Sequence, residues 1–199
     1  MPFQEFTALL LLATAMSFSP GPNTTLSTAL AANHGLRRTM RFVLAVPCGW
    51  GILLLLSAAG VSAMVAAAPM ARGAIKVAGI GYLLWMAFKF WGNGQMAQAR
   101  QDQLQVGFWQ GVALQFVNIK AWLLALSIVG GWIAGQPDVP ARMVVVLPVM
   151  LFYAFASNML YACIGALLRG WLAHGQRLLW FNRAMAVLLA ATAVWMLRA

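Results

Sequence analysis

The sequence predicts an all-α membrane protein with six transmembrane helices, arranged as two inverted repeats of three helices, with an interrupted first helix. Three observations predict this fold class. Of the 199 residues, 63% are hydrophobic and only 8% are charged, whereas a soluble domain carries about 25% charged residues. The uncharged stretches are long enough to cross a bilayer, which takes about 20 residues. The first stretch also carries two prolines and a glycine near its midpoint.

Charged residues divide the chain into six candidate spans. These are Phe3–His34, Phe42–Ala67, Ala74–Trp91, Gly107–Ala134, Met143–Leu168 and Leu178–Leu197. The longest polar connection, Gly92–Gln105, separates the two halves of what we expect to be a single polytopic domain. The first repeat covers residues 1–91, a polar loop follows at about 92–106, and the second repeat covers 107–199. With three spans in each half, the second half must enter the membrane upside down relative to the first.

The basic residues predict the orientation. The net charge is +10, but the Lys and Arg residues lie at the ends of apolar runs rather than in the patch that a nucleic-acid-binding protein needs. Counting them on the two sides places eight on one side and four on the other, which favours an extracytoplasmic N-terminus. No positively charged region precedes the first span, so we expect that span to be retained rather than cleaved as a signal peptide. We expect a lipid bilayer as the surroundings and no nucleic-acid partner.

The first span is too long for one straight helix. Phe3–His34 would measure about 48 Å, whereas the hydrocarbon core is about 30 Å thick. In the stretch SFSPGPNTTLS, Pro20 and Pro22 remove two backbone donors and disfavour a helical conformation in the residues before them. We therefore expect a break at Gly21, with a second half-helix starting near Pro22, since proline suits the first turn of a helix.

The fourth span has its own anomaly at a similar depth. Asn118 and Lys120 lie near its middle, and Lys120 is about 18 residues from Asp102 and from Asp138, the nearest charged residues. A lysine at mid-bilayer costs about 2.5–3.5 kcal/mol even on the most lenient scale. The three acidic residues all lie near span ends or in loops, so Lys120 has no counter-ion in the chain at this depth. We expect its partner to be a ligand.

Two breaks at mid-membrane, one in the first span of each half, are typical of transporters built from inverted repeats. A half-helix beginning in the membrane presents unpaired N–H groups and a positive dipole end, which suit a carboxylate. The carbonyls freed before the break, around Phe18 and Ser19, would accept an ammonium group. A purely structural interpretation stays open for each feature, because proline kinks are tolerated in membrane helices and an asparagine can simply hydrogen-bond a neighbouring helix.

Four segments of the chain form a recognisable set: SPGPN, AANHGLRRTMRFVLAVPCGWG, GIGYLLWMAFKFW and GFWQGVALQFVNIKAW. In this order they resemble the LysE/RhtB family of bacterial amino-acid exporters, and QFVNIK looks most like the branch with the cysteine and O-acetylserine exporter. The resemblance implies a six-helix protein of the bacterial inner membrane, not an enzyme, that exports small amino acids using an ion gradient. Its motifs fall on Pro20, Gly21, Pro22, Asn23, Asn118, Lys120, Tyr82 and Trp85.

The chain departs from this family at two points. Many members read Asn-Pro-Lys where this chain has Asn118-Ile119-Lys120, so the second break could be softer, or a continuous helix with a polar notch. Many relatives also carry an acidic residue near the stretch PCGWG, which has none here. A cationic substrate side chain would then lack a counter-charge, so we expect a small neutral amino acid, similar to cysteine and O-acetylserine or to threonine and homoserine.

The predicted mechanism is alternating access around a midplane site. We expect the substrate carboxylate to lie between the half-helix N-terminus at Asn23–Thr25 and the amine of Lys120. The residues expected to supply orienting hydrogen bonds are Thr24, Tyr82, Gln115 and Asn118. We expect a proton as the coupling ion, with Lys120 as its first candidate carrier and His34 as the second. The sequence indicates no catalytic residue, cofactor or metal ligand, and a homodimer is left open.

Two other functions compete with amino-acid export. One is an intramembrane thiol-disulfide relay that uses Cys48 and Cys163, which lie at similar depth in the proposed orientation. The other is a heavy-metal cation exporter on the same scaffold, although soft cations need convergent thiolates or imidazoles, and the two cysteines and two histidines do not visibly converge.

Overall fold

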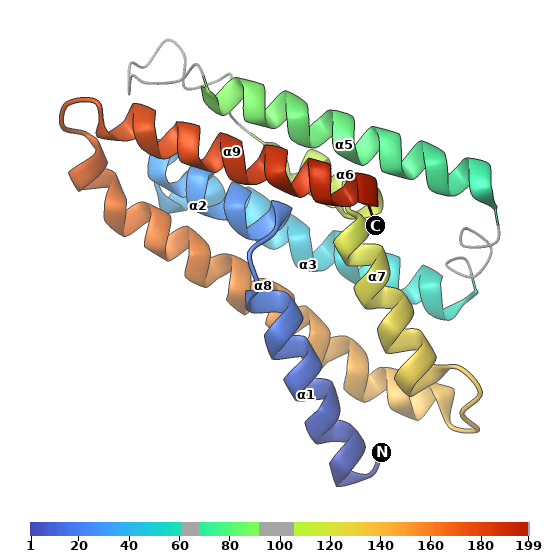
Figure 1. The fold of residues 1–199 in the computed structure, drawn as a ribbon. Helices are drawn as coiled ribbons and strands as arrows, with labels where there is room; N and C mark the ends of the chain where they lie inside the picture. The colour runs from blue at the N-terminus through green and yellow to red at the C-terminus, as the bar shows by residue number, and fades with distance from the viewer. Residues whose placement is uncertain (61–67, 92–105, 199) are drawn as a thin grey trace.

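The structure is a computed structural model that describes residues 1–60, 68–91 and 106–198. Within these ranges all regular elements are helical. They are α1 (Phe3–Phe18), α2 (Pro22–His34), α3 (Leu36–Ala58), α5 (Pro69–Trp91), α6 (Phe108–Val117), α7 (Ile119–Ile128), the π-helical turn η2 (Val129–Ile133), α8 (Val139–Leu172) and α9 (Arg177–Arg198). In Figure 1, α5 and α9 run side by side along one edge, and the long helix α8 runs along the other with α2 between α8 and α9.

The predicted break in the first span is confirmed. Helix α1 ends at Phe18, the backbone is extended at Ser19 and Gly21, and α2 begins at Pro22. Proline occupies the first turn of α2, where its missing N–H costs no intrahelical hydrogen bond. The two halves of the span are therefore separate helices that change direction at the Pro-Gly-Pro motif, as Figure 1 shows.

The fourth span is also broken rather than merely notched. Helix α6 ends at Val117, the backbone is extended at Asn118, and α7 begins at Ile119 after a bend of 68°. No proline is present to cause this bend. Instead, Asn118 Oδ1 accepts a hydrogen bond from the Lys120 backbone N–H at 3.1 Å, which makes Asn118 the N-cap of α7. Asparagine is among the preferred residues at that position.

The remaining helices begin or end away from the predicted span limits, because the spans were divided at charged residues and helices continue past them. Helix α3 begins at Leu36 rather than Phe42 and ends at Ala58, while residues 61–67 of the predicted second span lie outside the described residues. Helix α8 extends from Val139 to Leu172, beyond both ends of the predicted fifth span. The polar loop at 92–105 also lies outside the described residues.

The described helices make this a multi-pass membrane protein. Helices α3, α5, α8 and α9 are each long and apolar enough to cross a bilayer, and the bent pair of α6 with α7 and η2 forms a fifth candidate span. Helix α1 is a shorter apolar helix of 16 residues. At 1.5 Å per residue it covers about 24 Å, less than the hydrocarbon thickness of about 30 Å.

Two glycines let helices approach closely around the breaks. A Cβ atom at Gly49 of α3 would lie 2.7 Å from the Val112 carbonyl oxygen of α6 and 2.8 Å from Gln115 Cγ. A Cβ atom at Gly165 of α8 would overlap the Thr28 carbonyl oxygen of α2. Because hydrocarbon supplies no hydrophobic driving force between helices, such small residues favour association by allowing tight packing.

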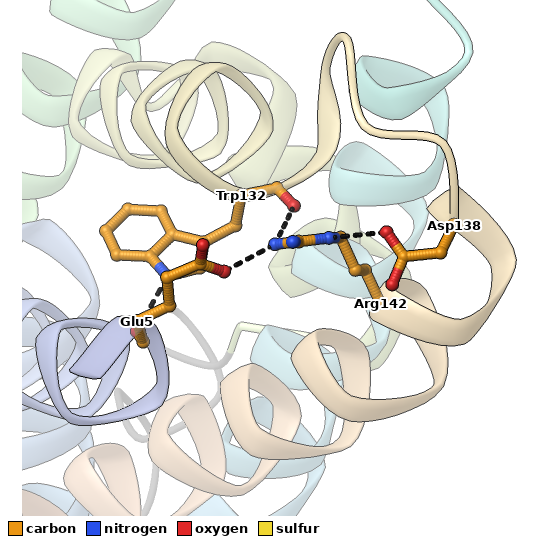
Figure 2. A network of polar contacts seen from close by, with 4 residues as sticks. All are labelled: Glu5, Trp132, Asp138 and Arg142. Atoms are coloured by element: carbon orange, nitrogen blue, oxygen red, sulfur yellow. Dashed lines mark hydrogen bonds and ion pairs between the residues drawn. The ribbon is translucent and has the colours of Figure 1, made fainter. Parts of the chain in front are cut away.

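A network of polar contacts around Arg142, the fourth residue of α8, lies at one end of the bundle (Figure 2). Its guanidinium donates to Glu5 Oε2 at 2.7 Å, to Asp138 Oδ1 at 2.8 Å and to the Trp132 carbonyl at 3.3 Å. The Trp132 indole N–H in turn donates to the Glu5 carbonyl at 2.9 Å. The network joins α1, η2 and α8. Glu5, Asp138 and Arg142 therefore lie at the same end of the bundle.

Candidate functional site

The two helix breaks meet through Lys120. This residue lies in the first turn of α7, and its Nζ donates hydrogen bonds to the Ser19 carbonyl oxygen at 2.9 Å and to Ser19 Oγ at 2.8 Å. Its side chain passes over Gly21, where an added Cβ would lie 3.2 Å from Nζ. The amine therefore points from the break of the fourth span into the break of the first.

Neutral oxygens, rather than a carboxylate, surround this amine. Among the described residues, the ion pairs join Glu5 and Asp138 to Arg142 at the end of the bundle, and Lys120 has no acidic partner. The Ser19 carbonyl is available because the helix ends one residue earlier. Ser19 Oγ accepts from Lys120 while it donates to the Met16 carbonyl at 3.0 Å.

The neighbouring freed carbonyl is also occupied. Tyr161 of α8 donates its hydroxyl to the Phe18 carbonyl at 2.9 Å. Buried backbone carbonyls without a partner are costly, so Tyr161 and Lys120 together satisfy the end of α1. The sequence predicted an ammonium acceptor at Phe18 and Ser19, and the ammonium group that Ser19 accepts in this structure is that of Lys120.

The N-terminus of α2 faces the same space. Gly21 has no side chain with which to cap the first turn, and its own N–H donates to Thr24 Oγ1 at 3.0 Å. The first N–H groups of α2, with the positive end of the helix dipole, are thus directed to the region around Lys120. Two sources of positive potential converge there, one from a side chain and one from the backbone.

A cavity of about 60 Å³ lies at this junction, large enough for a few water molecules. Six of the residues predicted from the sequence line it: Gly21, Pro22, Asn23, Thr24, Asn118 and Lys120. They come from α2, from α7 and from the capping position between α6 and α7. The two breaks therefore lie at one cavity, and the substrate-binding role of these six residues stays a prediction.

The other four predicted residues do not line the cavity. Pro20 is exposed, and Thr25 is buried within α2. Gln115 is fully buried and exchanges two side-chain hydrogen bonds with Asn23, at 2.8 Å and 3.2 Å. It therefore orients the Asn23 side chain without lining the cavity itself. Tyr82 of α5 packs with the apolar side chains around Val117.

The sequence analysis missed the other residues that line the cavity. They are Met16, Ser17, Val46, Trp50, Ala121, Leu124, Met150, Ala154, Ser157 and Asn158. Asn158 of α8 accepts a hydrogen bond from Ser27 Oγ at 2.9 Å and donates to the Ala154 carbonyl at 2.8 Å. Ser157 and Asn158 stand in the middle of an otherwise apolar helix, which is the same signal that identified Asn118.

The arrangement suits a small zwitterion. An amine and a helix N-terminus attract an oxygen anion, and the freed carbonyl of Ser19 attracts an ammonium. Metal binding has little basis in the described residues, where no group of three or more His, Cys, Asp or Glu side chains comes together. Cys48 and Cys163 are both free thiols.

Comparisons with known proteins identify the family to which the chain belongs. The family model for LysE type translocators matches residues 14–199. Proteins named cysteine/O-acetylserine efflux protein are similar to the chain: one from Klebsiella pneumoniae is 27% identical over 179 residues, covering 89% of this chain and 91% of the relative. One from Escherichia coli strain K12 is 30% identical over 187 residues, covering 92% and 91%. No solved structure matches the chain. The chain belongs to the LysE type translocator family, and is a translocator rather than an enzyme.

Proposed function

We propose that this protein is a secondary transporter that exports small neutral amino acids from the bacterial cytoplasm by alternating access. The observation that carries the proposal is the contact between the Lys120 amine and the freed Ser19 carbonyl, in a cavity whose described lining holds no acidic residue. The names of the relatives favour a substrate similar to cysteine or O-acetylserine.

The contact suggests how a substrate would bind. Before binding, the Lys120 ammonium satisfies the Ser19 carbonyl. A zwitterionic amino acid brings its own ammonium, which replaces Lys120 at that carbonyl and frees the amine to pair with the substrate carboxylate. The N-terminal turn of α2 supplies further donors to the same carboxylate. Lys120 thereby exchanges one partner for another and is never left unpaired in the membrane.

The size and chemistry of the cavity support a small neutral side chain. The cavity of about 60 Å³ must widen to hold an amino acid, and the departure of Lys120 from Ser19 begins that widening. Trp50, Met150 and Ala154 line the cavity and are apolar. A cationic substrate side chain would meet no carboxylate there, and would have to be buried without a counter-charge.

Several features favour two inverted repeats of about residues 1–91 and 107–199. The first span of each half is broken, as α1 with α2 and as α6 with α7. The next helix in each half carries an internal proline six residues after an arginine, Pro47 after Arg41 and Pro148 after Arg142. Under this proposal the basic end of the bundle faces the cytoplasm across the inner membrane, and a proton on Lys120 couples transport to the ion gradient.

The test is export by cells that carry Lys120→Ala, with Lys76→Ala as the matched control. Lys76 is also an amine with a carbonyl partner, Leu197 at 2.8 Å, but it lies on α5 outside the cavity. Loss of a charged hydrogen bond costs about 1.5–3 kcal/mol, so we expect export of O-acetylserine to fall about 10- to 150-fold in Lys120→Ala at equal membrane abundance. Export at the wild-type rate would refute the role of Lys120 in carboxylate binding.

A further inference from the structure

A second cavity lies at the basic end of the bundle, separate from the site around Lys120. Its volume is about 410 Å³, within the range of ligand pockets. The described residues that line it come from the C-terminal end of α2, the first turns of α3 and the start of α6. They are Leu30, His34, Arg37, Arg38, Thr39, Arg41, Phe42, Val106 and Gly107.

The charged side chains among the described residues that line this cavity are all basic. Arg37, Arg38 and Arg41 lie within the first two turns of α3, and no acidic residue is present in its first turn. Arg37 and Arg41 are four residues apart, a spacing at which like charges repel on a helix. All three also stand at the positive end of the α3 dipole, where an anion is favoured and a cation is not. Arg169 of α8 lies close by, with its Nη1 3.2 Å from where a Cβ of Gly35 would be.

Among the described residues, no acidic side chain neutralises Arg37 or Arg41. The ion pairs in this part of the chain are those of Arg142 at the opposite end, and Arg37 and Arg41 have no hydrogen-bond or ion-pair partner within it. Both side chains are exposed. The positive charges of Arg37 and Arg41, beside a cavity and at a helix N-terminus, call for a multivalent anion with several acceptor oxygens. A phosphate group has that chemistry, and Arg binds it through paired N–H donors.

The position of the cavity places it at the level of the lipid headgroups. Helix α3 is a candidate membrane span that starts at Leu36, and the bent span starts at Phe108, so both begin at this cavity. Its inner wall is apolar, formed by Leu30, Phe42 and Val106. Basic pockets between transmembrane helices on the cytoplasmic side bind anionic headgroups, and an apolar wall beside the arginines suits the acyl end of the same molecule.

We propose that this cavity is a binding site for a phosphate-bearing anion, held by Arg37 and Arg41. Two sources share this chemistry, the headgroup of an anionic phospholipid and a soluble phosphate. The site is independent of transport chemistry at Lys120, so its occupant stabilises the folded protein and need not be exported.

The test uses the purified full-length chain and the double variant Arg37→Gln, Arg41→Gln. The control variant is Arg177→Gln, which removes a charge from the start of α9, where Arg177 contacts Trp171 rather than this cavity. Native mass spectrometry and thermal unfolding are measured with phosphatidylglycerol, with phosphatidylcholine, and with inorganic phosphate against sodium chloride at equal ionic strength. At about fivefold per arginine near an anionic surface, phosphatidylglycerol should bind the double variant about 30-fold more weakly than the wild type or the control.

The measurements with lipid and with inorganic phosphate distinguish a phospholipid headgroup from a soluble phosphate. Stabilisation and retained lipid with phosphatidylglycerol alone identify a headgroup, and stabilisation by inorganic phosphate above the salt control identifies a soluble phosphate. Either result must be lost in the double variant and kept in Arg177→Gln. Equal losses per removed charge in the double variant and in Arg177→Gln would overturn the proposal, since they would indicate general surface charge. Absence of any difference between phosphatidylglycerol, phosphatidylcholine and phosphate in the wild type would also overturn it. Native mass spectrometry reads lipid retention directly, so the comparison holds even where a variant is less stable.

Discussion

Gly49→Ala should loosen the contact between α3 and α6 and displace Gln115, which hydrogen-bonds the cavity-lining residue Asn23. The added Cβ would lie 2.7 Å from the Val112 carbonyl oxygen and 2.9 Å from Val112 Cα, both backbone atoms, and 2.8 Å from Gln115 Cγ. An ordinary contact is about 3.4–4 Å, so the two helices must separate by about 0.7 Å. Overpacking of this kind costs about 1–3 kcal/mol.

Gly51→Ala is the matched control for this change. It lies on the same helix, and its Cβ would meet Leu151 Cδ2 at 2.9 Å, the end of a side chain that can rotate away. Both variants gain about 1 kcal/mol of helix propensity from the loss of glycine, and that gain cancels when they are compared. At about 3 °C per kcal/mol for a chain of this size, Gly49→Ala should unfold about 3–9 °C below Gly51→Ala.

The assay is thermal unfolding in detergent, followed by the fluorescence of the tryptophans, of which the chain has nine. Export is measured in parallel at a temperature where both variants are folded. Because Gln115 holds Asn23 through two hydrogen bonds, we expect Gly49→Ala to export more slowly than Gly51→Ala even when folded. Equal unfolding temperatures for the two variants would refute the reasoning about close packing.

Three further predictions concern the Arg142 network and the two cysteines. Arg142→Gln removes the contact to Glu5 that ties α1 to α8, so hydrogen exchange in α1 should become faster, while Lys76→Gln should leave it unchanged. The hydrogen bond from Arg142 holds the pKa of Asp138 below its ordinary value of 3.8. The stability that the ionised Asp138 carboxylate contributes is therefore complete above pH 3.8, and it is lost as the pH falls through the lower pKa of the folded state. The unfolding temperature should therefore fall below about pH 4, and less steeply in Asp138→Asn; identical curves would contradict this. The double variant Cys48→Ser, Cys163→Ser should export at the wild-type rate, and a loss of export with normal abundance would instead support the thiol relay.

The broken first span could be predicted from the sequence because its cause is local. Pro20 and Pro22 remove two backbone donors within three residues and disfavour a helical conformation at Ser19 and Gly21, so the sequence itself favours a break there. The break in the fourth span was left open for the opposite reason. Ile119 has an ordinary backbone donor, and α6 ends at Val117 because the Asn118 side chain caps α7, which begins at Ile119. Capping by asparagine competes with continuation of the helix, and sequence alone does not decide which is more stable.

The composition of the site could be predicted only in part. The depth of Lys120 in the fourth span follows from counting residues, but its contact with Ser19 depends on how α7 is rotated and packed. Ser157 and Asn158 were missed as lining residues because α8 has no break that draws attention to them, although both are polar residues in an apolar helix. Tyr82 was predicted from the family resemblance. In the structure it lies on α5, packs against an apolar cluster and does not line the cavity.

The carboxylate contact of Lys120 is tested most directly by calorimetric binding of O-acetylserine and of its methyl ester to the purified protein. The ester keeps the ammonium but has no carboxylate. We predict that the wild type binds the acid at least about tenfold more tightly than the ester, in line with a charged hydrogen bond of about 1.5 kcal/mol or more. In Lys120→Ala this preference should disappear. A preference for the acid that persists unchanged in Lys120→Ala would contradict the account.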